Sequence, residues 1–195
     1  MGRKGRNPET LRALITDSAE TIIVEQGLSG CTARAITTKA GCALGSLSYL
    51  FGGIEHVILA VNTRTLAVMG NLMFEQALKV TTERSADRLE ALALAYFHYA
   101  RDNLNRWHAL FALRLSSHEE LPEEYLTLRN GLIERITTFF AHDVETRGHS
   151  PQLLARTMYE AVHGVVILGL DQRLGGSPED VEERIRLLVK KLAAG

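Results

Sequence analysis

The chain has 195 residues, of which 46% are apolar and 23% charged, and its formal net charge is -1. Together with a mean hydropathy of -0.02, this composition is typical of a folded globular protein and excludes disorder as the main feature. The length predicts one or two domains with an adequate core. The near-neutral charge excludes a protein that coats nucleic acid indiscriminately.

The sequence also argues against a membrane or secreted protein. The longest dense apolar stretch, residues 161–170, is shorter than the roughly 18 residues that a spanning helix needs. The basic N-terminus precedes an amphipathic pattern and not an apolar signal core. Cys31 and Cys42 have neither disulfide-framework nor metal-site spacing. We therefore expect a cytoplasmic protein with two small buried thiols, and a redox switch as the alternative.

Nearly every segment repeats its apolar residues with the helical period, which predicts an all-α fold of about nine helices. Asn7 before Pro8 is a helix start signal, and Gly27 is a stop signal. Ser177 and Asp180 resemble a capping box. The expected helices cover residues 8–26, 33–40, 44–50, 54–81, 85–103, 105–114, 121–147, 151–174 and 178–192.

Residues 33–50 combine two short helices with a three-residue turn that contains Gly41. This arrangement is a helix-turn-helix motif, and its second helix fits a major groove about 12 Å wide. The alternative is a helical hairpin inside a core. Arg3, Lys4 and Arg6 precede the first helix with no acidic residue among them, so this arm can reach phosphates; a solvated terminus is the other interpretation.

A distinctive combination of residues accompanies this motif. Its members are Glu25-Gln26-Gly27 at the end of an apolar helix, Thr32, Ile36, Ala40-Gly41, Gly45, Leu47, Tyr49, Phe51 and Glu55. With this combination, residues from about Pro8 to Val68 resemble the DNA-binding domain of the tetracycline-repressor (TetR) family of transcriptional regulators. The rest of the chain resembles this family in length and helical layout.

The resemblance implies a DNA-facing surface and a three-helix core formed by Ile36, Ala40, Leu47 and Phe51. Leu47 and Phe51 are four residues apart on one helix face, so Ser46, Ser48 and Tyr49 project elsewhere. With the basic arm, the expected DNA-binding residues are Arg3, Lys4, Arg6, Thr32, Arg34, Leu44, Ser46, Ser48 and Tyr49.

The chain departs from the family pattern at three positions in this region. Ser48 stands where an aromatic residue is usual, Ile54 where a phosphate-binding lysine is usual, and Leu44 where a polar or basic residue is common. The departures shift the expected phosphate attraction toward the arm and Arg34.

The resemblance assigns DNA binding to residues 8–68, with a recognition helix at about 44–50, and ligand sensing and dimerisation to residues 69–195. In the family a small molecule enters a pocket between long helices and changes the spacing of the two DNA-reading heads. Core packing is the alternative role for each apolar or aromatic candidate. The candidates for a largely apolar ligand are Met69, Met73, Phe97, Trp107, His108, Phe111, Tyr125, Met158, Tyr159, Val162 and His163.

Two C-terminal helices carry the expected dimer interface. Residues 161–170 are apolar almost all round the helix, and the last helix has coiled-coil-like apolar spacing, so one chain offers too few helices to cover both. Gly164 and Gly169 allow close helix approach. We expect an isologous four-helix interface that includes Val165, Leu168, Gly169, Val181, Ile185, Leu188 and Leu192.

No catalytic or cofactor-binding motif is present. The sequence has no nucleophile–base arrangement, no phosphate-binding glycine loop and no histidine pair with metal-ligand spacing, so we expect neither an enzyme nor a cofactor or metal site. The expected function is a ligand-responsive, homodimeric DNA-binding regulator, most simply a repressor, that binds a pseudo-palindromic operator. The alternatives are a regulator that needs a corepressor and a helical interaction or scaffold protein.

Overall fold

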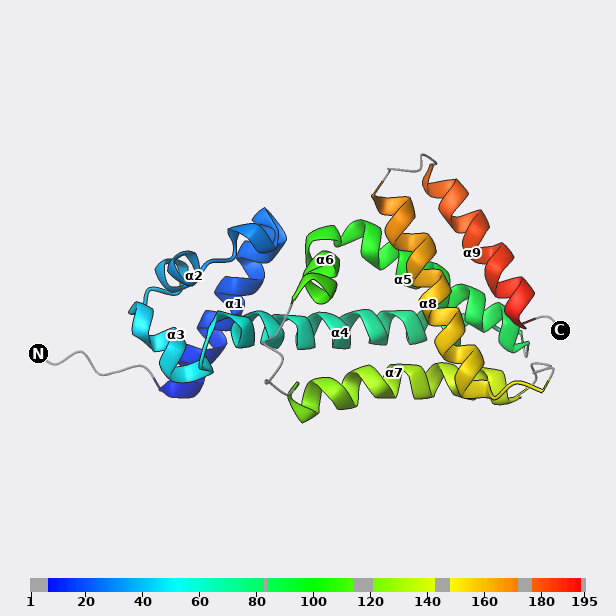
Figure 1. The fold of residues 1–195 in the computed structure, drawn as a ribbon, viewed down its shortest axis with the longest axis horizontal. Helices are drawn as coiled ribbons and strands as arrows, with labels where there is room; N and C mark the ends of the chain where they lie inside the picture. The colour runs from blue at the N-terminus through cyan, green and yellow to red at the C-terminus, as the bar shows by residue number, and fades with distance from the viewer. Residues whose placement is uncertain (1–6, 83, 114–120, 143–147, 172–176, 194–195) are drawn as a thin grey trace, which may run out of the picture. The chain divides into compact units, whose positions relative to one another are not determined.

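The computed structural model describes residues 7–82, 84–113, 121–142, 148–171 and 177–193. In these ranges the chain forms nine α-helices and one 3-10 helix, with no β-strand, which confirms the all-α prediction (Figure 1). The helices are α1 (Pro8–Gln26), η1 (Leu28–Gly30), α2 (Ala33–Ala40), α3 (Leu44–Phe51), α4 (Ile54–Lys79), α5 (Ser85–Asp102), α6 (Leu104–Ala112), α7 (Glu123–His142), α8 (Pro151–Leu170) and α9 (Pro178–Ala193).

Local capping signals explain most helix boundaries. Asn7 Oδ1 accepts the Glu9 N–H at 3.0 Å, and Thr32 accepts the N–H of Ala35. The predicted capping box is confirmed, because Ser177 N donates to Asp180 Oδ2 at 2.6 Å and Asp180 N donates to Ser177 Oγ at 3.3 Å.

Some sequence-based boundaries extend beyond the helices that the structure describes. The helix expected over 54–81 ends at Lys79, and a 3-10 turn, η1, occupies the expected linker after α1. The expected helix ends at residues 114, 147 and 174 lie outside the described residues.

The chain divides into two compact units. The first contains residues 1–66 and 103–121, and the second contains residues 67–102 and 122–195. Residues 103–121 therefore belong to the unit of the N-terminal helices, although α5 separates them in the sequence. The assignment of separate roles to residues 8–68 and 69–195 stays a prediction.

One apolar core joins α1, α2, α3, α6 and the start of α4 in the first unit. Ile15, Ile36 and Val57 are fully buried in it, and Leu47 is 3% exposed. The placement of Ile36, Ala40 and Leu47 in this core agrees with the sequence pattern, and half-buried Phe51 packs against it. This core gives the two short helices α2 and α3 a tertiary support that their length alone cannot provide.

The second unit is built around α5, which contacts α7, α8 and α9. Phe97, Phe140 and Met158 are almost completely buried there. Two glycines allow close packing: a Cβ on Gly70 would lie 2.5 Å from Leu132 Cδ2, and a Cβ on Gly169 would lie 2.5 Å from Val181 Cγ2. A larger residue at either position would therefore require the facing side chain, Leu132 or Val181, to move.

Candidate nucleic-acid interface

The helix-turn-helix motif is formed by α2, a three-residue turn and α3. Gly41 adopts the left-handed conformation, with φ 61° and ψ 45°, and its N–H bonds to Thr37 and Thr38 carbonyls. A residue with a Cβ is strained in this conformation, so the glycine allows the sharp change of direction before α3.

The two faces of α3 differ in burial. Leu47 is 3% exposed, and Leu50 and Phe51 pack against the core. On the other side Leu44 is 58% exposed, Tyr49 is 84% exposed and Ser48 is exposed, whereas Ser46 is half-buried. Three of the four α3 side chains that we expected to face DNA are therefore directed to solvent.

A contact that the sequence analysis missed holds the end of α3 against α1. The Arg12 guanidinium donates to the carbonyl oxygen of Leu50 and lies 4.4 Å from the centroid of the Phe51 ring. The carbonyl is at the C-terminal end of α3, where a cation is favourable. The 38-residue separation between donor and acceptor leaves no local sequence signal for this contact.

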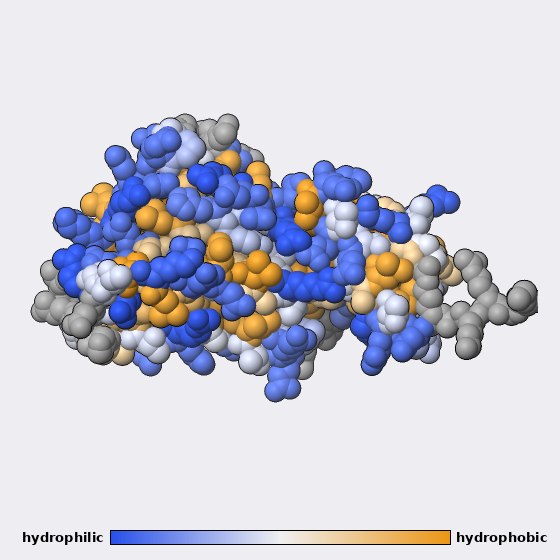
Figure 2. Space-filling model, turned by 180° about the vertical axis from the view of Figure 1, so that it is seen from behind, coloured by the Kyte–Doolittle hydropathy of each residue, from blue (hydrophilic) through white to orange (hydrophobic). Residues whose placement is uncertain are grey.

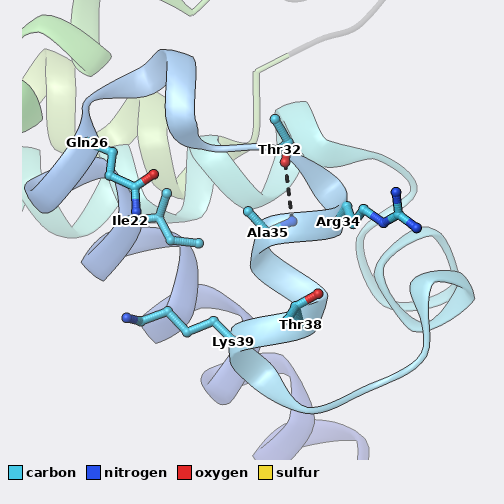
Figure 3. A pocket seen from close by; sticks show the side chains of 7 residues that line it. All are labelled: Ile22, Gln26, Thr32, Arg34, Ala35, Thr38 and Lys39. Atoms are coloured by element: carbon cyan, nitrogen blue, oxygen red, sulfur yellow. Dashed lines mark hydrogen bonds between the residues drawn. The ribbon is translucent and has the colours of Figure 1, made fainter.

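The exposed side of α2 borders an open pocket of about 470 Å³ between α1 and α2. Figure 3 shows Ile22 and Gln26 of α1 facing α2, while the Arg34 side chain extends away from them. Lys39 lies 3.7 Å from Glu25 in a solvent-exposed ion pair. The pocket is lined by Ile22, Gln26, Thr32, Arg34, Ala35, Thr38 and Lys39.

Only some of the expected phosphate-binding residues lie in the part of the chain that the structure describes. Thr32 and Arg34 are exposed at the start of α2, and the Thr32 hydroxyl caps the helix. Arg3, Lys4 and Arg6 lie outside the described residues. Within residues 32–49, the motif therefore presents hydroxyl groups, apolar side chains and the exposed guanidinium of Arg34 to solvent.

An ion-pair cluster that the sequence analysis also missed connects three helices of the first unit. Glu20 on α1 accepts from Arg64 of α4 at 2.9 Å and from Arg106 of α6, and Arg64 also donates to Asp17 at 2.6 Å. The carboxylates raise the pKa of Arg64. Since these residues come from distant segments, only the tertiary fold brings them together.

The candidate ligand residues divide between the two units. Trp107, His108 and Phe111 belong to the first, where Trp107 is buried and His108 is exposed. The other eight belong to the second. Met69, Met73, Phe97, Met158 and Val162 are buried, and Tyr125, Tyr159 and His163 are half-buried.

A polar cluster joins α5 and α8 inside the second unit. The Tyr96 hydroxyl lies 2.7 Å from His163 Nδ1, and the Tyr159 ring stacks on the His163 ring at a centroid distance of 6.0 Å. Burial lowers the pKa of His163 and raises the pKa of Tyr159. Both residues are therefore neutral at pH 7 and can exchange hydrogen bonds with a neutral polar group.

Two of the expected interface residues are already covered within a single chain. Val181 is 2% exposed and Ile185 is fully buried within a single chain, so neither has surface left for a partner. Gly169 makes its close approach to Val181 of the same chain. By contrast Leu168 is 48% exposed, and Val165, Leu188 and Leu192 are half-buried.

The exposed apolar surface of α8 also includes Ile167, which is 40% exposed, and a Cβ on Gly164 would meet nothing within 4 Å. On the face drawn in Figure 2, apolar residues form several patches with hydrophilic residues between them. Single exposed apolar residues are ordinary on a protein surface, whereas a contiguous apolar patch is a candidate contact surface.

The cysteines differ in environment. Cys31 is 5% exposed, and burial raises the pKa of its thiol to about 11, while Cys42 is half-buried. Among the described residues no group of three or more His, Cys, Asp or Glu side chains has the proximity that a metal site needs.

Two described helices, α4 and α8, are long and apolar enough to cross a membrane by length and composition. The most apolar window of α4 is 61% buried within the protein and that of α8 is 22% buried. Core helices of soluble proteins satisfy the same criterion, so this finding is weak evidence for a membrane.

Comparisons with known proteins agree with this architecture. The solved structures that it resembles include the regulator FadR from Bacillus subtilis in complex with stearoyl-CoA (TM-score 0.68, 16% identity, 94% of this chain and 98% of that chain). Another is the TetR family transcriptional regulator PfmR from Thermus thermophilus (TM-score 0.61, 17% identity, 92% and 96%). The fatty acid degradation regulator FadR from Bacillus halodurans gives a TM-score of 0.67 at 16% identity, with 100% and 98% covered.

Residues 89–192 match the family described as "Tetracyclin repressor-like, C-terminal domain". A comparison of the sequence with curated proteins finds no significant match. The matched segment exceeds half of the chain, and the helix-turn-helix unit precedes it. The chain belongs to the TetR family of transcriptional regulators.

This family consists of soluble cytoplasmic proteins that bind DNA operators and small-molecule effectors as dimers, and that are not enzymes. The protein is therefore a transcriptional regulator. The residues described above bear on which operator and effector this protein binds and on which helices join its subunits.

Proposed function

We propose that this protein is a cytoplasmic, homodimeric repressor that leaves a pseudo-palindromic operator when a largely apolar small molecule binds its C-terminal unit. The observation that carries the proposal is the exposed face of α3, with Leu44 at 58% and Tyr49 at 84% exposure. The opposite face packs on a core that includes α1, α4 and α6. A rigid helix with one free face is what major-groove recognition needs.

Two features support a ligand that is apolar with one polar group. The second unit supplies buried Met and aromatic residues, and the Tyr96–His163 pair adds neutral hydrogen-bonding groups beside them. Among proteins of this fold, one FadR was solved with stearoyl-CoA, and a multidrug-binding protein, EbrR, was solved with imidazole. A ligand acts on DNA binding only if it prefers one conformation of the dimer.

The exposed apolar surface of α8, which includes Ile167 and Leu168, supports dimerisation through this helix. Half-buried Leu188 and Leu192 of α9 extend the surface. Two DNA-reading heads in such a dimer contact half-sites about one DNA turn apart, roughly 34–36 Å.

The first experiment recovers fragments of source-genome DNA that the protein retains at near-physiological salt, followed by sequencing. A regulator enriches a pseudo-palindrome near a few promoters. Uniform retention that disappears with a modest rise in salt would contradict operator binding, because nonspecific binding is almost entirely electrostatic. That result would favour the scaffold function, unless binding returns when a corepressor is supplied.

Tyr49→Ala tests the role of α3 in this binding. Because Tyr49 is 84% exposed, we expect unchanged folding and roughly tenfold weaker operator binding, as for the loss of one DNA contact. Val24→Ala, at an exposed position on α1, is the matched control and should leave affinity unchanged. A Tyr49→Ala protein that fails to fold would contradict the solvent-exposed placement.

Release from DNA is measured on the recovered operator with a panel of acyl-CoA thioesters and neutral apolar compounds. A ligand that lowers affinity for the operator should do so less effectively in the His163→Phe protein. A compound that strengthens operator binding would instead identify a corepressor.

A further inference from the structure

The recognition helix α3 has no charged and no amide side chain, because its sequence is Leu-Gly-Ser-Leu-Ser-Tyr-Leu-Phe. Direct reading of guanine or adenine in the major groove relies mainly on bidentate contacts from Arg, Lys, Asn or Gln. None of these residue types is available on α3. Sequence discrimination by this helix must therefore use hydroxyl groups, an aromatic ring or apolar contact.

Leu44 is the first residue of α3 and is 58% exposed. The N-terminal residues of a recognition helix are the ones that meet base edges. Gly45 follows, and a Cβ built on it would find no atom within 4 Å. The leucine thus stands next to open space at the end of the helix that enters the groove.

Leu44 shares its helix face with Ser48, four residues on. Leu44, Ser48 and Tyr49 are all exposed, whereas Leu47, three residues after Leu44, turns into the core and is 3% exposed. Leu44 therefore makes no contribution to the core that supports α3. Its apolar side chain is therefore available to an apolar group of a partner. The hydroxyl groups of Ser48 and Tyr49 are available to polar groups of the same partner.

The neighbouring charges indicate what kind of partner this is. Arg34 is exposed on α2, and Lys39 is paired only loosely with exposed Glu25, at 3.7 Å. Arg34 and Lys39 thus give the exposed side of α2 two basic side chains, which are suited to a phosphate backbone. The one apolar group that DNA displays in its major groove is the 5-methyl group of thymine.

We propose that Leu44 is a specificity-determining residue that contacts the 5-methyl group of a thymine in each half-site. The inference rests on the proposed operator binding and deepens it, since it defines the chemistry that the operator must present. A thymine at this position is favoured over cytosine and over uracil, which has the same hydrogen-bonding groups as thymine without the methyl group.

The test replaces each thymine of the recovered operator by deoxyuridine, one symmetric pair of positions at a time, and measures affinity by fluorescence anisotropy at fixed salt. Removal of one buried methyl group should weaken binding about fourfold per half-site, or about 15-fold for both, by the transfer free energy of one methylene. One pair of positions should show this loss with the natural protein.

Variants of Leu44 test whether the preference for thymine over deoxyuridine depends on this side chain. Leu44→Ala should bind thymine and deoxyuridine operators equally, and Leu44→Met, which keeps a long apolar side chain, should retain the discrimination. Leu78→Ala is the matched control: Leu78 is 69% exposed on α4 and lies in the second unit, so its removal should leave the ratio unchanged.

The outcomes separate the two proposals. Strong operator binding with no deoxyuridine-sensitive position overturns the role of Leu44 and leaves the regulator function standing. Sensitivity that persists unchanged in Leu44→Ala also overturns it, and assigns the methyl contact to another residue such as Tyr49. Absence of any selective DNA binding overturns the proposed function together with this inference.

Discussion

The two cysteines differ in burial, and this difference decides how easily each thiol is reached. Cys31 is 5% exposed in the core of the first unit, and burial raises the pKa of its thiol from 9.0 to about 11. Since only the thiolate is nucleophilic, the buried thiol is unreactive at pH 8. The raised pKa also means that Cys31 favours the folded state fully below pH 9 and loses this contribution as the pH rises toward 11.

Alkylation with iodoacetamide at pH 8 should therefore modify Cys42 first and Cys31 only when the protein opens. Mass spectrometry of digested samples at increasing times measures both rates. In Cys42→Ser the fast phase should disappear, and in Cys31→Ser it should stay. Equal rates for the two thiols in the natural protein would show that Cys31 is accessible and would revive the redox-switch alternative.

At the level of the helices, burial decides how much each of the ion pairs that join α1, α4 and α6 contributes to stability. Arg64 binds Glu20, whose side chain is 19% exposed, and Asp17, whose side chain is 60% exposed. Exposed pairs contribute little because water screens them. Glu20, which also binds Arg106, is thus the carboxylate that attaches α4 and α6 to α1.

Glu20→Gln should lower the free energy of unfolding by about 1.5–3 kcal/mol, the range for hydrogen bonds to charged groups. Asp17→Asn removes the other partner of the same guanidinium and should cost less than about 1 kcal/mol. Urea unfolding followed by circular dichroism gives both values. A larger loss for Asp17→Asn than for Glu20→Gln would contradict the burial argument.

For the whole molecule, operator recognition depends on two subunits. The exposed apolar surface of α8 is the surface that we propose joins them. Leu168→Glu should give monomers in sedimentation velocity experiments, because a carboxylate buried in an apolar interface is strongly unfavourable. Operator affinity should fall at least about 100-fold, since each head then binds its half-site alone.

Leu78→Glu is the control, because it places the same charge at a more exposed leucine on α4. We expect it to remain dimeric. Dimers of Leu168→Glu with natural affinity would show that another surface joins the subunits. Ile185, which is buried in the chain itself, is unsuitable for this test because a charge there would disturb folding.

The class of the protein and the outline of its recognition motif follow from the sequence. Helical periodicity, Thr32 as a cap and Gly41 as a turn residue are local signals, and they predicted α2 at its observed bounds and the start of α3. The alternation of buried Leu47 and half-buried Phe51 with exposed Ser48 and Tyr49 follows from the same helical geometry.

Which apolar residues are covered within one chain depends on how the helices pack in three dimensions. Val181 and Leu168 carry the same periodic signal, yet Val181 is buried against Gly169 whereas Leu168 is exposed. Periodicity identifies an apolar face but not what covers it. The contacts of Arg12 with α3 and of Glu20 with α4 and α6 were likewise invisible in the sequence, because such contacts depend on how distant helices pack.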